Sequence, residues 1–178
     1  MTEEKKKNIR WHFLYLAILL WIAVLSWMVM IFMMSAEPGH ISVGRSADMT
    51  EIINRYLGAD LSEFVVRKLA HVFEFAVLTI LSYSAFACTF RISIHKSIIK
   101  RNQTDLKDGF QINALLSMWI TVLYASVDEY HQVFVPGRSG SVFDLLLNIA
   151  AGFAILVVLR VFIAIGRIFF KKKEADKL

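Results

Sequence analysis

The sequence has a single cysteine, Cys88, among 178 residues, so no disulfide can form within the chain. It also lacks a basic face interleaved with aromatic side chains, which is the usual surface for stacking nucleic-acid bases, so we expect no nucleic-acid partner. We find no internal repeat and no low-complexity segment. With these classes set aside, the apolar residues carry most of the information in the chain.

Hydrophobic residues make up 57% of the chain and the mean hydropathy is +0.55, whereas soluble domains are usually about 45–50% apolar. The apolar residues form long blocks, and blocks of roughly 18 residues or more predict membrane-spanning helices. The blocks cover residues 12–34, 65–90, 112–135 and 141–165. We therefore expect an all-α fold, an integral membrane four-helix transmembrane bundle, forming one domain over residues 12–165.

The first block resembles a signal peptide but is too long for one. Its apolar run from Phe13 to Met34 exceeds the roughly 7–15 residues of a signal-peptide core, and no convincing small-residue cleavage site follows it. We expect an uncleaved first span.

Lysine and arginine indicate how the spans cross the membrane. The net charge is +5, and the cations are concentrated in residues 1–11, 91–107 and 166–178, while the segments 36–64 and 136–140 hold few. Cytoplasmic segments carry the excess of lysine and arginine. We therefore expect a multi-pass protein of the cell membrane with a cytoplasmic N-terminus (1–11), a basic cytoplasmic tail (166–178), and the first and third loops outside.

Two connecting segments have local signals. The stretch 47–58 predicts a short amphipathic helix, in which Ile52, Ile53, Tyr56 and Leu57 share a side and Gly58 is the C-cap. The stretch "PGRSG" at 136–140 predicts a tight turn between the last two spans.

Polar residues share one helix face on each of the last three spans. They are Arg67, His71 and Glu74; Asp128, His131 and Gln132; and Asp144 and Asn148. Because ionisable groups are costly in lipid, they normally face a bundle interior or a wet cavity. The expected topology brings all three groups, and Ser35 at the end of the first span, to one depth. We therefore expect an outward-opening polar pocket lined by the second, third and fourth spans.

Three motifs in order carry a resemblance to a known family: "FMMSAEPG", "RKLAHVFEFAVL" and "DEYHQVFVPGRSGSVFDLLLNIAAG". With the intervening spans they cover about residues 12–155, and the chain resembles the VanZ-like family of small bacterial membrane proteins. Phe75 stands where a tyrosine is also common in that family. The resemblance implies an integral membrane protein of Gram-positive type. The name-giving member is linked to low-level antibiotic resistance toward teicoplanin-type glycopeptides, but the resemblance supplies no biochemical mechanism.

The polar residues also suggest chemistry. Imidazole and carboxylate groups together could exchange protons near neutral pH or hold a divalent metal ion as cofactor. The catalytic candidates are His71, Glu74, Asp128, Glu129, His131 and Asp144. Their spacing matches no known metal signature, and a buried ion network that locks the spans together is the alternative.

A second set of residues could bind a ligand. Arg67, Lys68 and Arg138 could grip a phosphate, because guanidinium offers a fork of donors; alternatively, Arg67 and Lys68 mark the membrane interface by snorkelling. The remaining ligand-binding candidates are Ser35, Gln132 and Asn148. The sequence has no phosphatase signature, and Ser35 and Ser139 are only weak candidates for a nucleophile.

Three functional hypotheses remain open. The first is a binding or protective protein whose pocket engages a lipid-linked envelope component or a lipoglycopeptide among the membrane lipids. The second is an intramembrane enzyme that modifies a lipid headgroup or lipid phosphate, with or without a metal. The third is a small transporter or accessory subunit.

Overall fold

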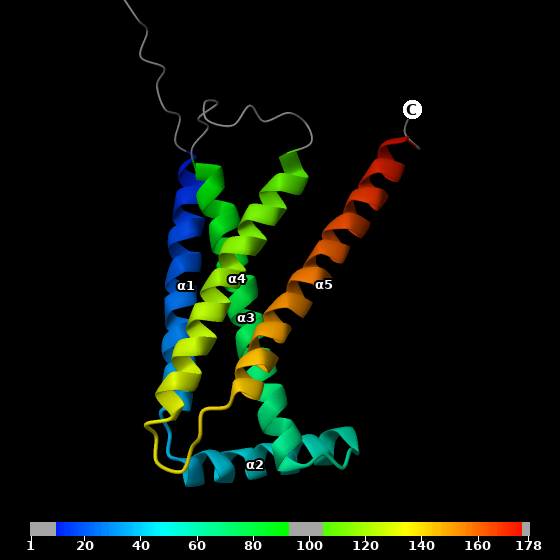
Figure 1. Ribbon diagram of the computed structural model, residues 1–178. Coiled ribbons are helices and arrows are strands. Elements are labelled where there is room, and N and C mark those ends of the chain that lie inside the picture. The colour runs from blue at the N-terminus through cyan, green and yellow to red at the C-terminus, as the bar shows by residue number, and fades with distance from the viewer. Residues whose placement is uncertain (1–9, 93–104, 176–178) are drawn as a thin grey trace, which may run out of the picture.

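A computed structural model describes residues 10–92 and 105–175, which form five helices and no strand (Figure 1). The helices are α1 (Trp11–Ser35), α2 (Gly39–Leu57), α3 (Glu63–Ile92), α4 (Asp105–Gln132) and α5 (Val142–Ala175). The predicted all-α class is confirmed. Half of the cations on which the orientation rests lie in residues 1–9, 93–104 and 176–178, outside the described residues. The orientation therefore stays a prediction.

Four helices in the described part of the chain are long and apolar enough to cross a membrane. Their spans are Trp11–Ser35, Glu63–Ile92, Gly109–Gln132 and Val142–Phe169. The predicted four-helix transmembrane bundle is therefore confirmed. The third span ends at Gln132 rather than at residue 135. Val133, Phe134 and Val135 donate to carbonyls three residues back, and Pro136 disfavours the helical conformation in the residue before it.

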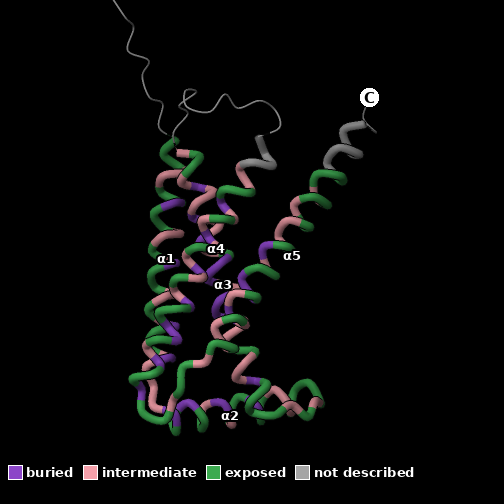
Figure 2. Tube along the Cα trace, viewed as in Figure 1, coloured by how far each residue is buried: buried purple, intermediate pink, exposed green. Residues whose placement is uncertain are grey.

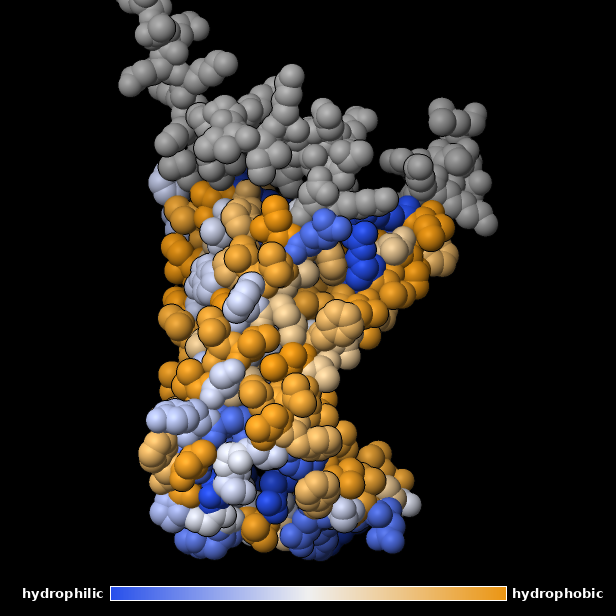
Figure 3. Space-filling model, in the orientation of Figure 1, coloured by the Kyte–Doolittle hydropathy of each residue, from blue (hydrophilic) through white to orange (hydrophobic). Residues whose placement is uncertain are grey.

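Helices α1, α3 and α4 pack side by side, whereas α5 packs on α3 and α4 near its start and then diverges from them (Figures 1 and 2). α2 lies across the end of the bundle where α1 ends and α3 begins (Figure 1). We name this the pocket end, and the other the opposite end. On the face seen in Figure 3 the middle of the bundle is largely apolar, and hydrophilic side chains lie at the pocket end and near the opposite end, as expected for a bundle whose middle contacts lipid.

Side-chain bonds to backbone and hydroxyl groups join α1 to its neighbours. Trp27 Nε1 donates to the Glu74 carbonyl at 2.9 Å, and Trp21 Nε1 donates to Thr89 Oγ1 at 3.1 Å. The Tyr124 hydroxyl donates to the Met28 carbonyl. Between these bonds lies a buried cluster of apolar side chains that includes Val24, Ile31, Phe75 and Leu78. Because lipid is as apolar as leucine, such packing and hydrogen bonds hold the helices together.

α2 is longer than the short helix predicted at 47–58, because it already begins at Gly39. Its predicted C-cap is confirmed, since Gly58 has a left-handed φ of 60°. Gly39 donates to the Pro136 carbonyl at 2.9 Å. A Cβ on Gly39 would lie 2.1 Å from the Gly137 carbonyl oxygen. The α4–α5 turn therefore fixes the start of α2, and only glycine allows this close approach.

Candidate functional site

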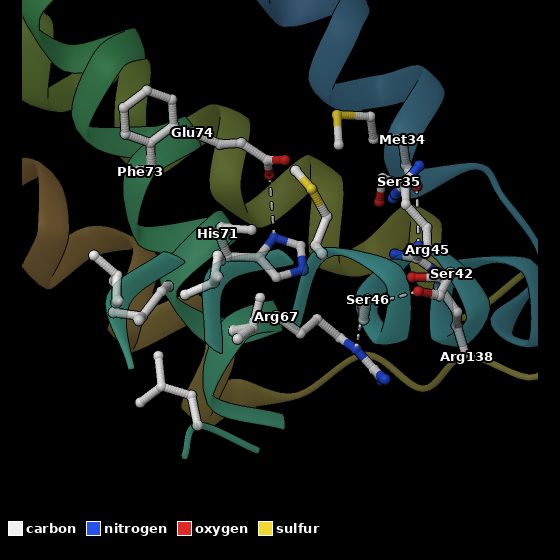
Figure 4. A pocket seen from close by; sticks show the side chains of 17 residues that line it. Met34, Ser35, Ser42, Arg45, Ser46, Arg67, His71, Phe73, Glu74 and Arg138 are labelled. Carbon is white, nitrogen blue, oxygen red and sulfur yellow. Dashed lines mark hydrogen bonds and ion pairs between the residues drawn. The ribbon is translucent and has the colours of Figure 1, made fainter. Parts of the chain in front are cut away.

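A pocket of about 490 Å³ lies at the pocket end, between the end of α1, the inner face of α2 and the first turns of α3 (Figure 4). One part of its wall is polar and carries Arg45, Arg67, Arg138, His71, Glu74 and the serines 35, 42 and 46. The rest is apolar, with Met49, Ile53, Leu57, Leu69 and Phe73 among its residues. This volume is typical of a small-molecule site.

Three arginines reach the polar part of the pocket from three segments: Arg45 from α2, Arg67 from α3 and Arg138 from the α4–α5 loop (Figure 4). Arg45 forms an ion pair with Glu37. Arg67 Nε donates to Ser46 Oγ at 3.4 Å. Burial lowers the pKa of Arg138, and the positive charge of Arg45 lowers it further. The site therefore concentrates positive charge, which favours an anionic ligand.

Arg138 also has a structural contact. Its Nε donates to the Glu37 carbonyl at 3.0 Å and its second guanidinium nitrogen donates to the Met34 carbonyl at 2.9 Å. The last carbonyls of a helix lack intrahelical partners, so Arg138 caps the end of α1. The same side chain thus fixes the α1–α2 connection and supplies charge to the pocket.

His71 and Glu74 form a pair on the pocket wall. They lie three residues apart on α3, and His71 Nδ1 is 3.3 Å from Glu74 Oε2 (Figure 4). The Glu74 side chain is buried. An imidazole paired with a carboxylate can accept or donate a proton, so this pair has the geometry for acid–base chemistry next to a bound ligand.

Asp128, Glu129 and Gln132 lie on α4 outside the lining of this pocket. Gln132 Nε2 donates to Asp128 Oδ2 at 3.0 Å, and Asp128 is within electrostatic range of His71 and Glu74. Glu129 Oε2 accepts from the backbone N–H of Ser141 at 2.9 Å. Because this N–H lies at the start of α5, Glu129 fixes the beginning of that helix.

The other predicted residues occupy two further places. Lys68 and Asp144 form an ion pair that joins α3 to α5, and Asn148 is fully buried one turn further along α5. His131 stacks on Phe32 of α1, with ring centroids 4.5 Å apart. These four residues are outside the lining of the pocket.

The pocket expected between the second, third and fourth spans stays a prediction, because the described pocket is lined by α1, α2 and α3 together with Arg138. Of the predicted residues, Ser35, Arg67, His71, Glu74 and Arg138 line the observed pocket, and their neighbours come from α1 and α2. Arg45, Ser42 and Ser46 also line the pocket but were not among the predicted site residues. The four-residue spacing of Ser42, Ser46 and Thr50 was the available signal, because it marks one helix face.

In the described residues, no group of three or more His, Cys, Asp or Glu side chains lies close enough together to hold a metal ion. Ser35 Oγ is buried and has no hydrogen-bond partner in the described part of the chain. Ser139, the other weak candidate for a nucleophile, lies in the exposed α4–α5 loop. The three arginines and the His71–Glu74 pair place cationic groups beside a histidine–carboxylate pair on one pocket wall.

The fold and the pocket define a polytopic α-helical membrane protein with an amphipathic pocket at one end of its bundle. Residues 18–163 match the VanZ/LLP1 family. Since the match covers more than half of the sequence, the chain belongs to the VanZ/LLP1 family, which confirms the resemblance carried by its three motifs. No curated protein and no solved structure gives a significant match to the chain.

Proposed function

We propose that the pocket binds a lipid-linked phosphate of the cell envelope. The observation that carries the proposal is the meeting of three guanidinium groups, from Arg45, Arg67 and Arg138, at the polar part of a pocket whose remaining wall is apolar. Guanidinium is the side-chain group that best matches phosphate geometry. A lipid phosphate combines the anion and the hydrocarbon that these two walls favour.

The electrostatics support an anion as occupant. Three positive charges face one another, and the repulsion contributes to the lowered pKa of Arg138. Glu37 pairs with Arg45, and the negative charges of Asp128 and Glu37 act against the lowering of the Arg138 pKa. A bound phosphate would offset the remaining repulsion and accept several charge-assisted hydrogen bonds.

The apolar wall of the pocket favours the hydrocarbon tail of a lipid as part of the ligand. Leu57 is 73% exposed, Phe73 61% and Leu69 53%, although all three line the pocket. The apolar side of the pocket is therefore continuous with the lipid-facing surface of the bundle. A pocket of about 490 Å³ suits a headgroup and the start of a chain, and the rest of a long tail would stay in the bilayer.

The cellular role follows from the membrane orientation that the cations favour. In a Gram-positive cell membrane, a pocket facing outward would meet lipid-linked wall intermediates, which are also the surroundings in which teicoplanin-type glycopeptides act. Occupying or shielding such an intermediate would lower the action of the antibiotic. The resemblance to the VanZ-like family points to the same phenotype. A lipoglycopeptide, with its own apolar tail, is the alternative occupant.

Binding of farnesyl phosphate to the full chain in nanodiscs tests the proposal, with farnesol as the ligand that lacks the anion. We expect farnesyl phosphate to bind and Arg67→Gln to weaken it at least tenfold. Arg55→Gln is the matched control, because Arg55 lies exposed on α2 in an ion pair with Glu51. Equal binding of farnesol, or equal loss in both variants, would contradict phosphate recognition.

A cellular test addresses resistance separately. Expression of the chain in a glycopeptide-sensitive Gram-positive host should raise the inhibitory concentration of teicoplanin, and Arg67→Gln should abolish the rise. If the purified protein binds teicoplanin but not farnesyl phosphate, the lipoglycopeptide is the occupant instead.

The His71–Glu74 pair favours a second function, modification of the bound headgroup. A pair 3.3 Å apart on the pocket wall could act as general base toward water or a headgroup hydroxyl. Mass spectrometry of farnesyl phosphate incubated with the reconstituted chain, with and without divalent metal, tests this function. A product that disappears in Glu74→Gln while binding persists would establish an enzyme, and an unchanged lipid in all samples would exclude this substrate.

A further inference from the structure

Polar side chains continue from the pocket end toward the opposite end, along the interface of α3, α4 and α5. At mid-depth the hydroxyls of Thr79 and Thr121 lie 2.8 Å apart. Gly152 lies at the same level, because a Cβ there would come within 2.9 Å of both threonines. All three helices therefore meet at this point.

Polar residues continue above and below this level: on α4 they lie four residues apart from Asn113 to Thr121, and Asp128 follows two turns later. We name them the polar file; its members are Glu74, Thr79 and Ser82 on α3, Asn113, Ser117, Thr121 and Asp128 on α4, and Asn148 on α5. Each of these side chains is buried. The residues from Asn113 to Asp128 rise about 22 Å along α4, whereas the hydrocarbon core of a bilayer is about 30 Å thick. The file thus crosses most of the membrane.

Several members of the file lack hydrogen-bond partners within the described residues. Neither the nitrogen nor the oxygen of the Asn148 amide has one, although the residue is 0% exposed. The same holds for Ser82 Oγ and Asn113 Oδ1. Unpaired polar groups are costly in a membrane interior. If the file served only to hold the helices together, we would expect the Asn148 amide to hydrogen-bond to a neighbouring helix. Water molecules along the file would instead provide hydrogen-bond partners for this amide.

We propose that the polar file is a hydrated proton path between the opposite end and the acid–base cluster at the pocket end. A proton enters from water at one end, passes along the hydroxyls, amides and water of the file, and leaves into water at the other end. The step is therefore net proton transfer, with no covalent product and no change of oxidation state. At the pocket end the path reaches His71 and Glu74 on α3 and Asp128 and Glu129 on α4, with the Lys68–Asp144 ion pair beside them.

Arg160 lies near the opposite end of the file, two helical turns beyond Gly152 on α5. Its guanidinium carbon is 4.9 Å from the centre of the Phe110 ring. A fixed positive charge at the end of a path opposes the passage of cations. The proton flux should therefore be slow and should rise when this charge is removed.

Proton flux into liposomes tests the path. The full chain is reconstituted around a trapped pH-sensitive dye, and a potassium gradient with valinomycin supplies the driving force. We expect the proton flux of liposomes that contain the chain to exceed that of protein-free liposomes. This excess flux should fall at least tenfold in Asn148→Leu and should rise in Arg160→Met. Ser126→Ala, on the exposed side of α4, should equal the unmodified chain. No excess flux, an unchanged flux in Asn148→Leu, or no rise in Arg160→Met would overturn the proposal.

A second measurement protects the test against a misfolded variant. In a Cys88→Ser chain, Ser117→Cys and Ser126→Cys each replace one hydroxyl oxygen on α4 with sulfur. Residue 117 is fully buried and residue 126 is exposed. Only a hydrated thiol ionises and reacts with a small charged methanethiosulfonate reagent. We expect Ser117→Cys to react at least tenfold faster than Ser126→Cys. Equal or reversed rates would show that the file is dry and would overturn the path.

Discussion

Replacing Arg138 with lysine tests whether a fork of donors, rather than a charge alone, is needed in the α4–α5 loop. Arg138 donates to the Met34 and Glu37 carbonyls from two different nitrogens of one planar group. The ammonium of lysine keeps the positive charge but is a single point at the end of a flexible chain. It cannot reach both carbonyls and a phosphate at once.

The expected loss follows from these bonds. A hydrogen bond to a charged group contributes about 1.5–3 kcal/mol, and lysine forfeits at least one of the two. We therefore expect Arg138→Lys to lower the free energy of unfolding by about 1.5–3 kcal/mol. If the lysine stays with a carbonyl, the pocket loses one charged donor, and a tenfold loss of farnesyl phosphate affinity corresponds to about 1.4 kcal/mol.

Thermal unfolding and farnesyl phosphate binding, both in nanodiscs, measure the two effects. Arg55→Lys is the control, since Arg55 is exposed, pairs with Glu51 and is not in the pocket lining. If Arg138→Lys unfolds at the same temperature as the unmodified chain and binds the ligand equally, neither the cap on α1 nor the anion site depends on the guanidinium fork.

Two further predictions concern packing and topology. Gly152→Ala should destabilise the bundle by about 1–3 kcal/mol, because the added methyl would lie 2.8 Å from Thr79 Oγ1. Thermal unfolding measures this loss, with Gly166→Ala as the control, because a Cβ at Gly166 meets no atom within 4 Å. Equal stability of the two variants would contradict the close packing at Gly152. His40→Cys and Ser139→Cys, in a Cys88→Ser chain, should both react with an impermeant thiol reagent on intact cells, since both positions are exposed at the pocket end. Labelling only after the cells are opened would reverse the proposed orientation.

The spans could be predicted because their signal lies in single long blocks. The first block maps onto α1 within one residue at each end, since nothing but a membrane helix accommodates such a run. The limits of α2 could not be predicted in the same way. Its first half contains Ser42, Gly44 and Ser46, whose helix propensities are low. The bundle overrides these propensities, because the buried face of α2 packs on α3 and Gly39 contacts Gly137.

The faces of α3 and α4 were also predictable, but their partners were not. Spacings of four and three residues placed Arg67, His71 and Glu74 on one face, and all three line the pocket. The spacing could not show that α2 and the end of α1 would cover that face and form the pocket. That arrangement depends on contacts between segments about 100 residues apart, such as Arg138 with Met34, and no local pattern encodes them.

The pair His71 and Glu74 belongs to the pocket wall, and Glu74 is also the last α3 member of the polar file at the pocket end. A phosphate held by the arginines would therefore lie beside the group to which the file delivers protons. Thermodynamic linkage requires that proton binding and phosphate binding at neighbouring groups change each other by the same factor. Farnesyl phosphate should then change the proton flux of the reconstituted chain, and Arg67→Gln should remove that effect. If farnesyl phosphate leaves the flux unchanged, the pocket and the path work separately.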